Sequence, residues 1–182
     1  MAHLTIISCT NRPESRSLAV ANIYASLSKD TWTSVSVHSL EELNGMTIEA
    51  SMYGAEHQDE KIRRFQDEVI LPGNHFLFVI PEYNGTFSGI LKFLIDAVSI
   101  RDKDKSFKGK NVAMIGVASG RSGNLRGMDH LTNALNYLGM NTFQSKILVS
   151  QIHKVLSPEG TMDEATMDLF KSHSMQYLDY CS

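Results

Sequence analysis

The segment CTNRPESRS (9–17), the first loop, carries side chains suited to a phosphate-binding site. Thr10, Ser15 and Ser17 offer hydroxyls. Arg12 offers positive charge, and the backbone amides that open a following helix would point to the same place. A monophosphate suits these donors, because the nucleotide-loop patterns GxxxxGK(S/T) and GxGxxG are both absent. The alternative is that the hydroxyls only cap the helix, as Ser and Thr commonly do.

The segment PEYNGTFSG (81–89), the second loop, has the composition of a turn that lies against a flat ligand. Its glycines allow positive φ angles or close approach of the backbone. The amides of Tyr83, Asn84 and Gly85 are then in reach of the carbonyl and nitrogen acceptors of a ring. The alternative is a tight strand-to-helix turn capped by Asn84 or Ser88, with Tyr83 either stacked on a ring or packed at a subunit contact.

The segment SGRSGN (119–124), the third loop, repeats this composition with two glycines and two serines. Taken alone it is a flexible connection before a helix. Three such loops at neighbouring strand ends indicate a shared ligand with a phosphate at one end and a planar hydrogen-bonding ring at the other.

The elements that must position these loops are read from the apolar pattern, which alternates between strands and helices. This alternation predicts an α/β flavodoxin-like three-layer sandwich, in which a five-stranded parallel sheet of order 2-1-3-4-5 has helices on both faces. In that order strands one, three and four lie side by side, so the three loops meet at one cleft. A final helix is expected after a capping box at Thr161 and Glu164. We expect strands at 4–8, 33–40, 75–80, 111–118 and 142–150, with helices around 20–27, 62–69, 90–98 and 128–138.

The composition is that of one ordinary globular domain over residues 1–182, with 42% hydrophobic and 20% charged residues. A net charge of -3 argues against a nucleic-acid partner and against a strongly acidic electron shuttle, and it favours a small-molecule partner. Neither the two cysteines nor the seven histidines have metal-ligand spacing, so no metal is expected. No apolar run approaches about 18 residues, so no membrane partner is expected, and a cytoplasmic location fits best.

The first and second loops carry a family resemblance. CTNRPESRS resembles the phosphate loop G-S-x-R-x-x-S-x-N of the NADPH-dependent FMN reductases, flavodoxin-like flavoproteins that include quinone and azo-dye reductases. PEYNGTFSGILKFLIDA (81–97) resembles their second motif, PEYNGSxPGxLKNAIDW. Cys9 stands for glycine, Ser88 for proline, Phe93 for asparagine and Ala97 for tryptophan. We expect Cys9 to be a small buried residue at a strand end.

The resemblance implies a single FMN-binding domain and an FMN-dependent NAD(P)H oxidoreductase. Hydride passes from NADPH or NADH through bound FMN to a flavin, quinone or similar small acceptor, and no side chain acts as the catalytic acid or base. It also implies a homodimer or homotetramer. The alternative is a non-catalytic FMN-binding electron carrier or redox sensor. The implied cofactor-binding residues are Thr10, Arg12, Ser15, Ser17, Pro81, Glu82, Tyr83, Asn84, Gly85, Ser119, Gly120, Arg121 and Gly123.

Overall fold

The computed structural model describes residues 2–47, 49–54 and 58–182. Its centre is a parallel sheet in the order β2-β1-β3-β4-β5, which confirms the predicted order and the flavodoxin-like α/β fold. The apolar runs of the sequence become the central strands because a parallel sheet is covered on both faces. The four long strands are β1 (His3–Ser8), β2 (Ser34–Ser39), β3 (His75–Pro81) and β4 (Asn111–Val117).

The fifth position of the sheet is divided between two short strands, so the predicted continuous strand at 142–150 is wrong. β5 (Asn141–Thr142) pairs with the start of β4, and β6 (Ile147–Val149) pairs with its end. Between them the chain turns toward a C-terminal helix. The carbonyl of Ser145 accepts a hydrogen bond from His173 Nε2 at 3.0 Å, and the buried ring of Phe143 packs against that histidine. Side-chain packing outside the sheet therefore interrupts the ladder.

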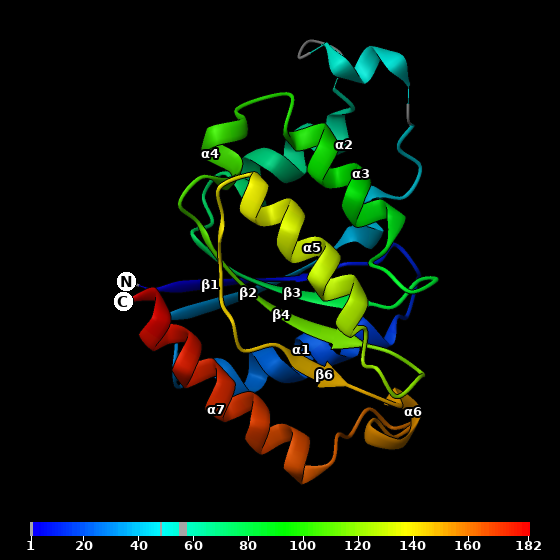
Figure 1. Cartoon of the computed structure of the whole chain (residues 1–182), viewed down its shortest axis with the longest axis vertical. Helices are drawn as coiled ribbons and strands as arrows, with labels where there is room; N and C mark the ends of the chain where they lie inside the picture. Colours follow the sequence, from blue (N-terminus) through cyan, green and yellow to red (C-terminus); the bar gives the residue numbers. More distant parts are fainter. Residues whose placement is uncertain (1, 48, 55–57) are drawn as a thin grey trace.

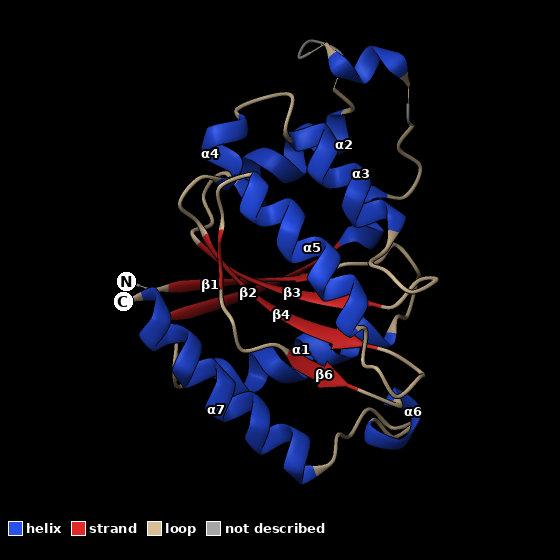
Figure 2. Cartoon of the chain, in the orientation of Figure 1, coloured by secondary structure: helices blue, strands red, loops and turns tan. Residues whose placement is uncertain are grey.

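Helices cover both faces of the sheet and make three layers (Figure 1, Figure 2). One face holds α1 (Arg16–Ser28) and α7 (Glu164–Cys181). The other holds α3 (Gly89–Val98), α5 (Leu125–Tyr137) and α2 (Glu60–Phe65), which continues as the π-helical segment η4 (Gln66–Ile70). The short elements were not predicted: η1 (Leu40–Leu43), η2 (Ala50–Tyr53), α4 (Lys103–Phe107) and α6 (Ile152–Val155).

Each face of the sheet has its own apolar core. Tyr24 of α1 packs against Phe170 of α7, with ring centroids 5.3 Å apart. The start of α7 corrects a prediction, because its N-cap is Asp163 and not Thr161. The Asp163 carboxylate accepts from the backbone amide of Thr166 at 2.9 Å, so no capping box forms between Thr161 and Glu164.

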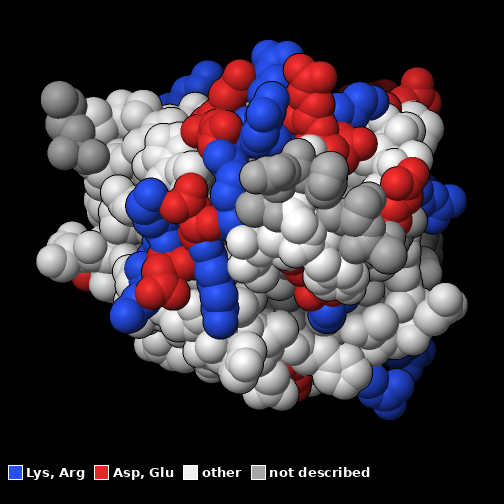
Figure 3. All heavy atoms as spheres, turned by 90° about the horizontal axis from the view of Figure 1, so that it is seen from above, with Lys and Arg blue, Asp and Glu red and all other residues white. Residues whose placement is uncertain are grey.

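The surface over α2, α3 and α4 carries basic and acidic side chains close together (Figure 3). Several form ion pairs along a helix, such as Arg64 with Glu68 at 3.0 Å and Lys92 with Asp96 at 2.6 Å. Exposed pairs of this kind contribute little to stability, and they leave no patch of one sign in this view. Within the described residues, no helix has the length and apolar character needed to cross a membrane.

Candidate functional site

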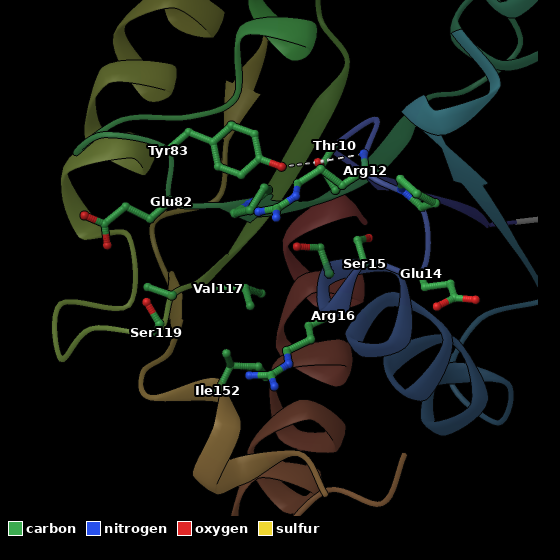
Figure 4. A pocket seen from close by; sticks show the side chains of 14 residues that line it. Thr10, Arg12, Glu14, Ser15, Arg16, Glu82, Tyr83, Val117, Ser119 and Ile152 are labelled. Carbon is green, nitrogen blue, oxygen red and sulfur yellow. Dashed lines mark hydrogen bonds between the residues drawn. The ribbon is translucent and has the colours of Figure 1, made fainter. Parts of the chain in front are cut away.

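The carboxyl ends of β1, β3 and β4 open into a cleft of about 350 Å³ (Figure 4). All three loops contribute to it, as the strand order predicted. The predicted residues that line the cleft are Thr10, Arg12, Ser15, Ser17, Pro81, Glu82, Tyr83 and Ser119. The other predicted residues, Asn84, Gly85, Gly120, Arg121 and Gly123, lie on the same loops but do not line it.

The two serine hydroxyls of the first loop have different roles, one in capping a helix and one at the cleft. Ser15 caps α1, because its side chain accepts from the amide of Leu18 at 3.1 Å. Ser17, in the first turn, is only 2% exposed and lines the cleft. Within the described chain, its hydroxyl has no hydrogen-bond partner, and neither do the amides of Arg16 and Ser17. The Ser17 hydroxyl and these amides lie at the cleft where α1 begins, so they are placed to bind an anion at the helix N-terminus.

Thr10 connects the first loop to the second. Its hydroxyl lies 2.5 Å from the hydroxyl of Tyr83 and also accepts from the amide of Arg12 at 3.2 Å. The guanidinium carbon of Arg12 lies 6.0 Å from the centroid of the Tyr83 ring. Thr10 therefore holds Tyr83 across the mouth of the cleft, which is a structural role as well as a ligand-facing one.

The second loop is a two-residue hairpin turn. Asn84 and Gly85 have φ angles of 52° and 77°, and the turn is closed by hydrogen bonds between the backbones of Tyr83 and Thr86 at 2.9 and 3.1 Å. This is the type I′ pattern that Asn-Gly favours. The Tyr83 amide is thus used inside the turn, which corrects its expected role toward a ring. In the described structure the amides of Asn84 and Gly85 donate to no protein acceptor.

Ser88 caps α3, so the second loop also has the structural role that was its alternative interpretation. The Ser88 side chain accepts from the amide of Leu91 at 3.4 Å and donates to the carbonyl of Cys9 at 2.5 Å. Cys9 is fully buried, and burial raises the pKa of its thiol well above the ordinary value. Cys9 is therefore a small buried residue at a strand end, as expected.

The third loop is fixed by contacts with the segment after β6. The carbonyl of Gly120 accepts from the amide of Gln151 at 3.0 Å, and the carbonyl of Arg121 accepts from the hydroxyl of Ser150 at 2.7 Å. Gly123 packs so closely on β6 that an added Cβ would lie 2.7 Å from the Cβ of Leu148. Its role is close packing. The amides of residues 119–121 have no acceptor among the described residues and border the cleft at Ser119.

Asn124 was not predicted, although it positions two of the loops. Its side chain is 1% exposed and donates to the carbonyls of Ile80 and Pro81, at 3.1 and 3.0 Å. The residue has a φ of 64° and precedes α5 without capping it through its side chain. An asparagine after glycine at a helix start is a turn signal, but the side-chain partners lie more than 40 residues away and leave no trace in the local pattern.

The cleft contains further residues that sequence reasoning did not single out. Glu14 belongs to the first loop, Val117 ends β4, and Ala118 follows it. Ile152, from α6, closes the cleft opposite the first loop, next to the Arg16 side chain (Figure 4). Apolar residues at strand ends are indistinguishable from core residues in the sequence, so nothing marked them as lining a site.

The donors in the cleft suit a ligand such as FMN, with a phosphate at one end and a flat ring at the other. The free amides, the Ser17 hydroxyl and the two arginines gather around the start of α1. Apolar Val117 and Pro81 and the free amides of the third loop border the other part. Pockets of this size, largely preformed with a few polar groups, are typical of cofactor sites.

Comparison with known proteins agrees with this geometry. The family model described as NADPH-dependent FMN reductase matches residues 2–154. An NAD(P)H-dependent FMN reductase from Pseudomonas aeruginosa is 30% identical over 112 residues, which cover 60% of this chain and 60% of that protein. A quinone reductase from Pseudomonas putida is 29% identical over 138 residues, covering 69% of this chain and 74% of that protein. The match thus spans less than two thirds of the first relative.

Solved structures show the same fold over nearly the whole chain. The flavoenzyme FerB, an NAD(P)H:(acceptor) oxidoreductase from Paracoccus denitrificans, superposes with a TM-score of 0.81 at 21% identity and covers 98% of this chain and 96% of that one. An FMN-dependent NADH-azoreductase from Bacillus anthracis, solved in complex with FMN, has a TM-score of 0.67 at 15% identity and covers 97% and 99%.

Proposed function

Because the chain belongs to the NADPH-dependent FMN reductase family, we propose that it binds FMN in the cleft and uses NAD(P)H to reduce a small acceptor. The acceptor class is a flavin or a quinone. With a quinone, NAD(P)H and one proton yield NAD(P)+ and the hydroquinone. When bound, FMN supplies the two-electron chemistry, since its ring takes up hydride and passes it on. The observation that supports FMN most directly is the Ser17 hydroxyl, which lines the cleft and has no protein partner in the described structure.

The protein's own residues then bind and orient. The Ser17 hydroxyl and the amides of Arg16 and Ser17 would hold the phosphate, and Arg12 would add charge at the same end. The amides of residues 119–121, which border the cleft at Ser119, would face the polar edge of the ring. Fixed donors of this kind stabilise negative charge on a reduced ring without reorganising. No general acid or base is required.

The assembly follows from the family resemblance and the location from the sequence, and both are part of the proposal. We propose a homodimer or homotetramer in the cytoplasm, with a small-molecule acceptor and neither nucleic acid nor membrane as partner. The competing role is a carrier or sensor that holds FMN without turning over NAD(P)H. The net charge of the chain is only -3, whereas an electron shuttle docks on its partners through a strongly acidic surface.

The proposal is tested by the visible spectrum of the purified protein after FMN is added and the excess removed. A retained flavin band that bleaches promptly when NADPH is added without oxygen supports the reductase. A retained band that stays oxidised supports the carrier or sensor and contradicts the reductase. The absence of a retained band contradicts tight FMN binding, and steady-state oxidation of NADPH at increasing FMN then distinguishes FMN used as a substrate from a protein that does not use it.

A further inference from the structure

The phosphate end of the cleft adjoins a second cavity of about 340 Å³. Glu14, Ser15 and Arg16 line both cavities, so the first loop and the start of α1 form a wall that the two share. On the other side α6 contributes Ile152 to the cleft and the next residue, His153, to the second cavity. We call this second cavity the outer pocket. A ligand whose phosphate lies at the start of α1 therefore has room beyond that phosphate.

Two cationic or donor side chains stand where the cavities meet. Arg16 lines both cavities and lies next to Ile152 (Figure 4). Among the residues that the structure describes, neither Arg16 nor His153 forms an ion pair, and the side chain of Glu14 points away from Arg16 (Figure 4). A guanidinium without a carboxylate partner suits a phosphate group, which it contacts through two N–H donors.

The outer pocket also has an apolar surface. Ala19 of α1 lines it, together with Leu156 and Pro158, which follow α6. Leu156 is 8% exposed and belongs to the core beneath this face of the sheet, against which Ala19 also packs. At Gly160 an added Cβ would meet no atom within 4 Å, so the rim of the pocket is open there. Apolar surface beside a few polar groups is typical of sites for flat ligands.

The far wall of the outer pocket is held in place by the backbone. The amide of Ile152 donates to the carbonyl of Ala118 at 3.0 Å, which attaches α6 to the end of the sheet. After α6, the amide of Asp163 donates to the carbonyl of Val155 at 3.1 Å, and Leu156 pairs with Met162 in a β-bridge. The outer pocket is therefore preformed, and a ligand need not order this segment when it binds.

We propose that the outer pocket binds the adenosine phosphate half of FAD, so that the protein takes FAD as well as FMN. This inference rests on the proposed function, because it assumes that the flavin phosphate lies at the start of α1. FAD is FMN with adenosine monophosphate joined to its phosphate. Arg16 then lies between the two phosphates, and the adenine packs on the apolar surface of the outer pocket. An adenosine phosphate also occurs in NAD(P)H, and the test separates these two sources.

The test fills the outer pocket with the variant Ala19→Phe. Ala134→Phe is the matched control, because Ala134 is also a partly buried alanine in a helix and lines a separate groove between α3 and α5. Binding of FMN and of FAD to the apoprotein is measured by isothermal titration calorimetry. The NADPH concentration that gives the half-maximal rate of flavin bleaching is measured without oxygen on FMN-saturated protein.

We expect the wild type to bind FAD within about tenfold of its affinity for FMN. Ala19→Phe should weaken FAD binding about tenfold or more and change FMN binding by less than about twofold, because the added ring occupies the space of the adenosine alone. Ala134→Phe should change both by less than about twofold.

A second pair of variants keeps the test valid if Ala19→Phe does not fold. His153→Ala removes a donor from the outer pocket and should weaken FAD binding about threefold, with FMN unchanged. Lys154→Ala is its control, because Lys154 is the next residue of α6, is also exposed and does not line the outer pocket. The control should bind both flavins as the wild type does.

Three results would overturn the inference: wild-type protein that binds FMN but not FAD, equal losses of FAD affinity in the two phenylalanine variants, or a higher NADPH requirement of Ala19→Phe with FAD affinity unchanged. The last result would assign the outer pocket to the adenosine of NAD(P)H. Failure of the proposed function looks different. In that case NADPH does not bleach the bound flavin, while calorimetry still decides whether the outer pocket binds FAD, and protein that binds neither flavin contradicts both proposals.

Discussion

Replacement of Ser17 by alanine separates a ligand-binding hydroxyl from a structural one. Ser17 is 2% exposed and lines the cleft, and in the described structure its hydroxyl bonds to no protein atom. Removal of that hydroxyl costs the free protein no hydrogen bond. We therefore expect the free energy of unfolding without ligand to stay the same or to rise slightly.

The effect on FMN is large by comparison. A hydrogen bond to a charged group contributes about 1.5 to 3 kcal/mol. Each 1.4 kcal/mol changes a dissociation constant about tenfold, so Ser17→Ala should weaken FMN binding roughly 10- to 150-fold. Riboflavin, which lacks the phosphate, should bind as it does to the wild type. Ser15 is a poorer target, because its side chain caps α1 and its loss would also destabilise the helix.

The assay is titration of flavin fluorescence with the apoprotein, for FMN and for riboflavin. Ser8→Ala is the control, because Ser8 is a buried serine whose hydroxyl has no partner in the described structure but does not line the cleft. The control should bind both flavins as the wild type does. An unchanged affinity of Ser17→Ala for FMN, or an equal loss for riboflavin, would show that the phosphate lies elsewhere.

Three further predictions concern the helix cap at Ser88, the close packing of Gly123 and the buried His173. Ser88→Ala should lower the free energy of unfolding by about 2 kcal/mol, because it removes a buried hydrogen bond to Cys9 and a helix cap. Ser26→Ala, which removes an exposed hydrogen bond within α1, should change it by less than about 0.5 kcal/mol, and similar urea midpoints for the two variants would refute the cap argument. Gly123→Val should lower the free energy of unfolding by more than about 3 kcal/mol, since the residue has a φ of 56° and its Cβ would overlap β6. A thermal unfolding midpoint equal to that of the wild type would contradict this prediction. Burial lowers the pKa of His173 below its usual value of about 6.5, so the unfolded chain takes up the proton first and stability falls as pH drops below about 6.5. His173→Gln should flatten that slope in urea unfolding at pH 5 and 7.5, and an unaltered slope would assign the dependence to other groups.

The central sheet and the meeting of the three loops were predictable because the signals are local. Apolar runs at 4–8, 75–80 and 111–118 mark strands covered on both faces, and short polar segments follow each of them. The strand order then brings their ends together. The division of the fifth strand was not predictable, because it depends on contacts that Ser145 and Phe143 make with His173 of α7, which is distant in the sequence.

Roles within the loops depend on geometry that no local pattern contains. Ser15 and Ser17 are the same residue type two positions apart, yet one caps the helix and the other faces the cleft. Tyr83 was expected to offer its amide to a ligand, but the turn uses that amide. The hydrogen bond from Asn11 Nδ2 to Asn44 Oδ1 joins the first loop to the segment after β2, and such a contact between distant segments leaves no periodic pattern in the sequence.

Two departures from the family motifs are in contact in the fold. Cys9 replaces a glycine in the first motif and Ser88 replaces a proline in the second, and the two residues are joined by the hydrogen bond from the Ser88 hydroxyl to the Cys9 carbonyl at 2.5 Å. Proline has no side-chain donor, so this bond exists only with the substituted residue. It connects the end of β1 to the start of α3, which are the two points that set the spacing between the first and second loops. The Cys9 side chain packs in the core, and its backbone carbonyl accepts from a donor that proline could not supply. The Ser88 hydroxyl therefore connects the two loops that border the cleft.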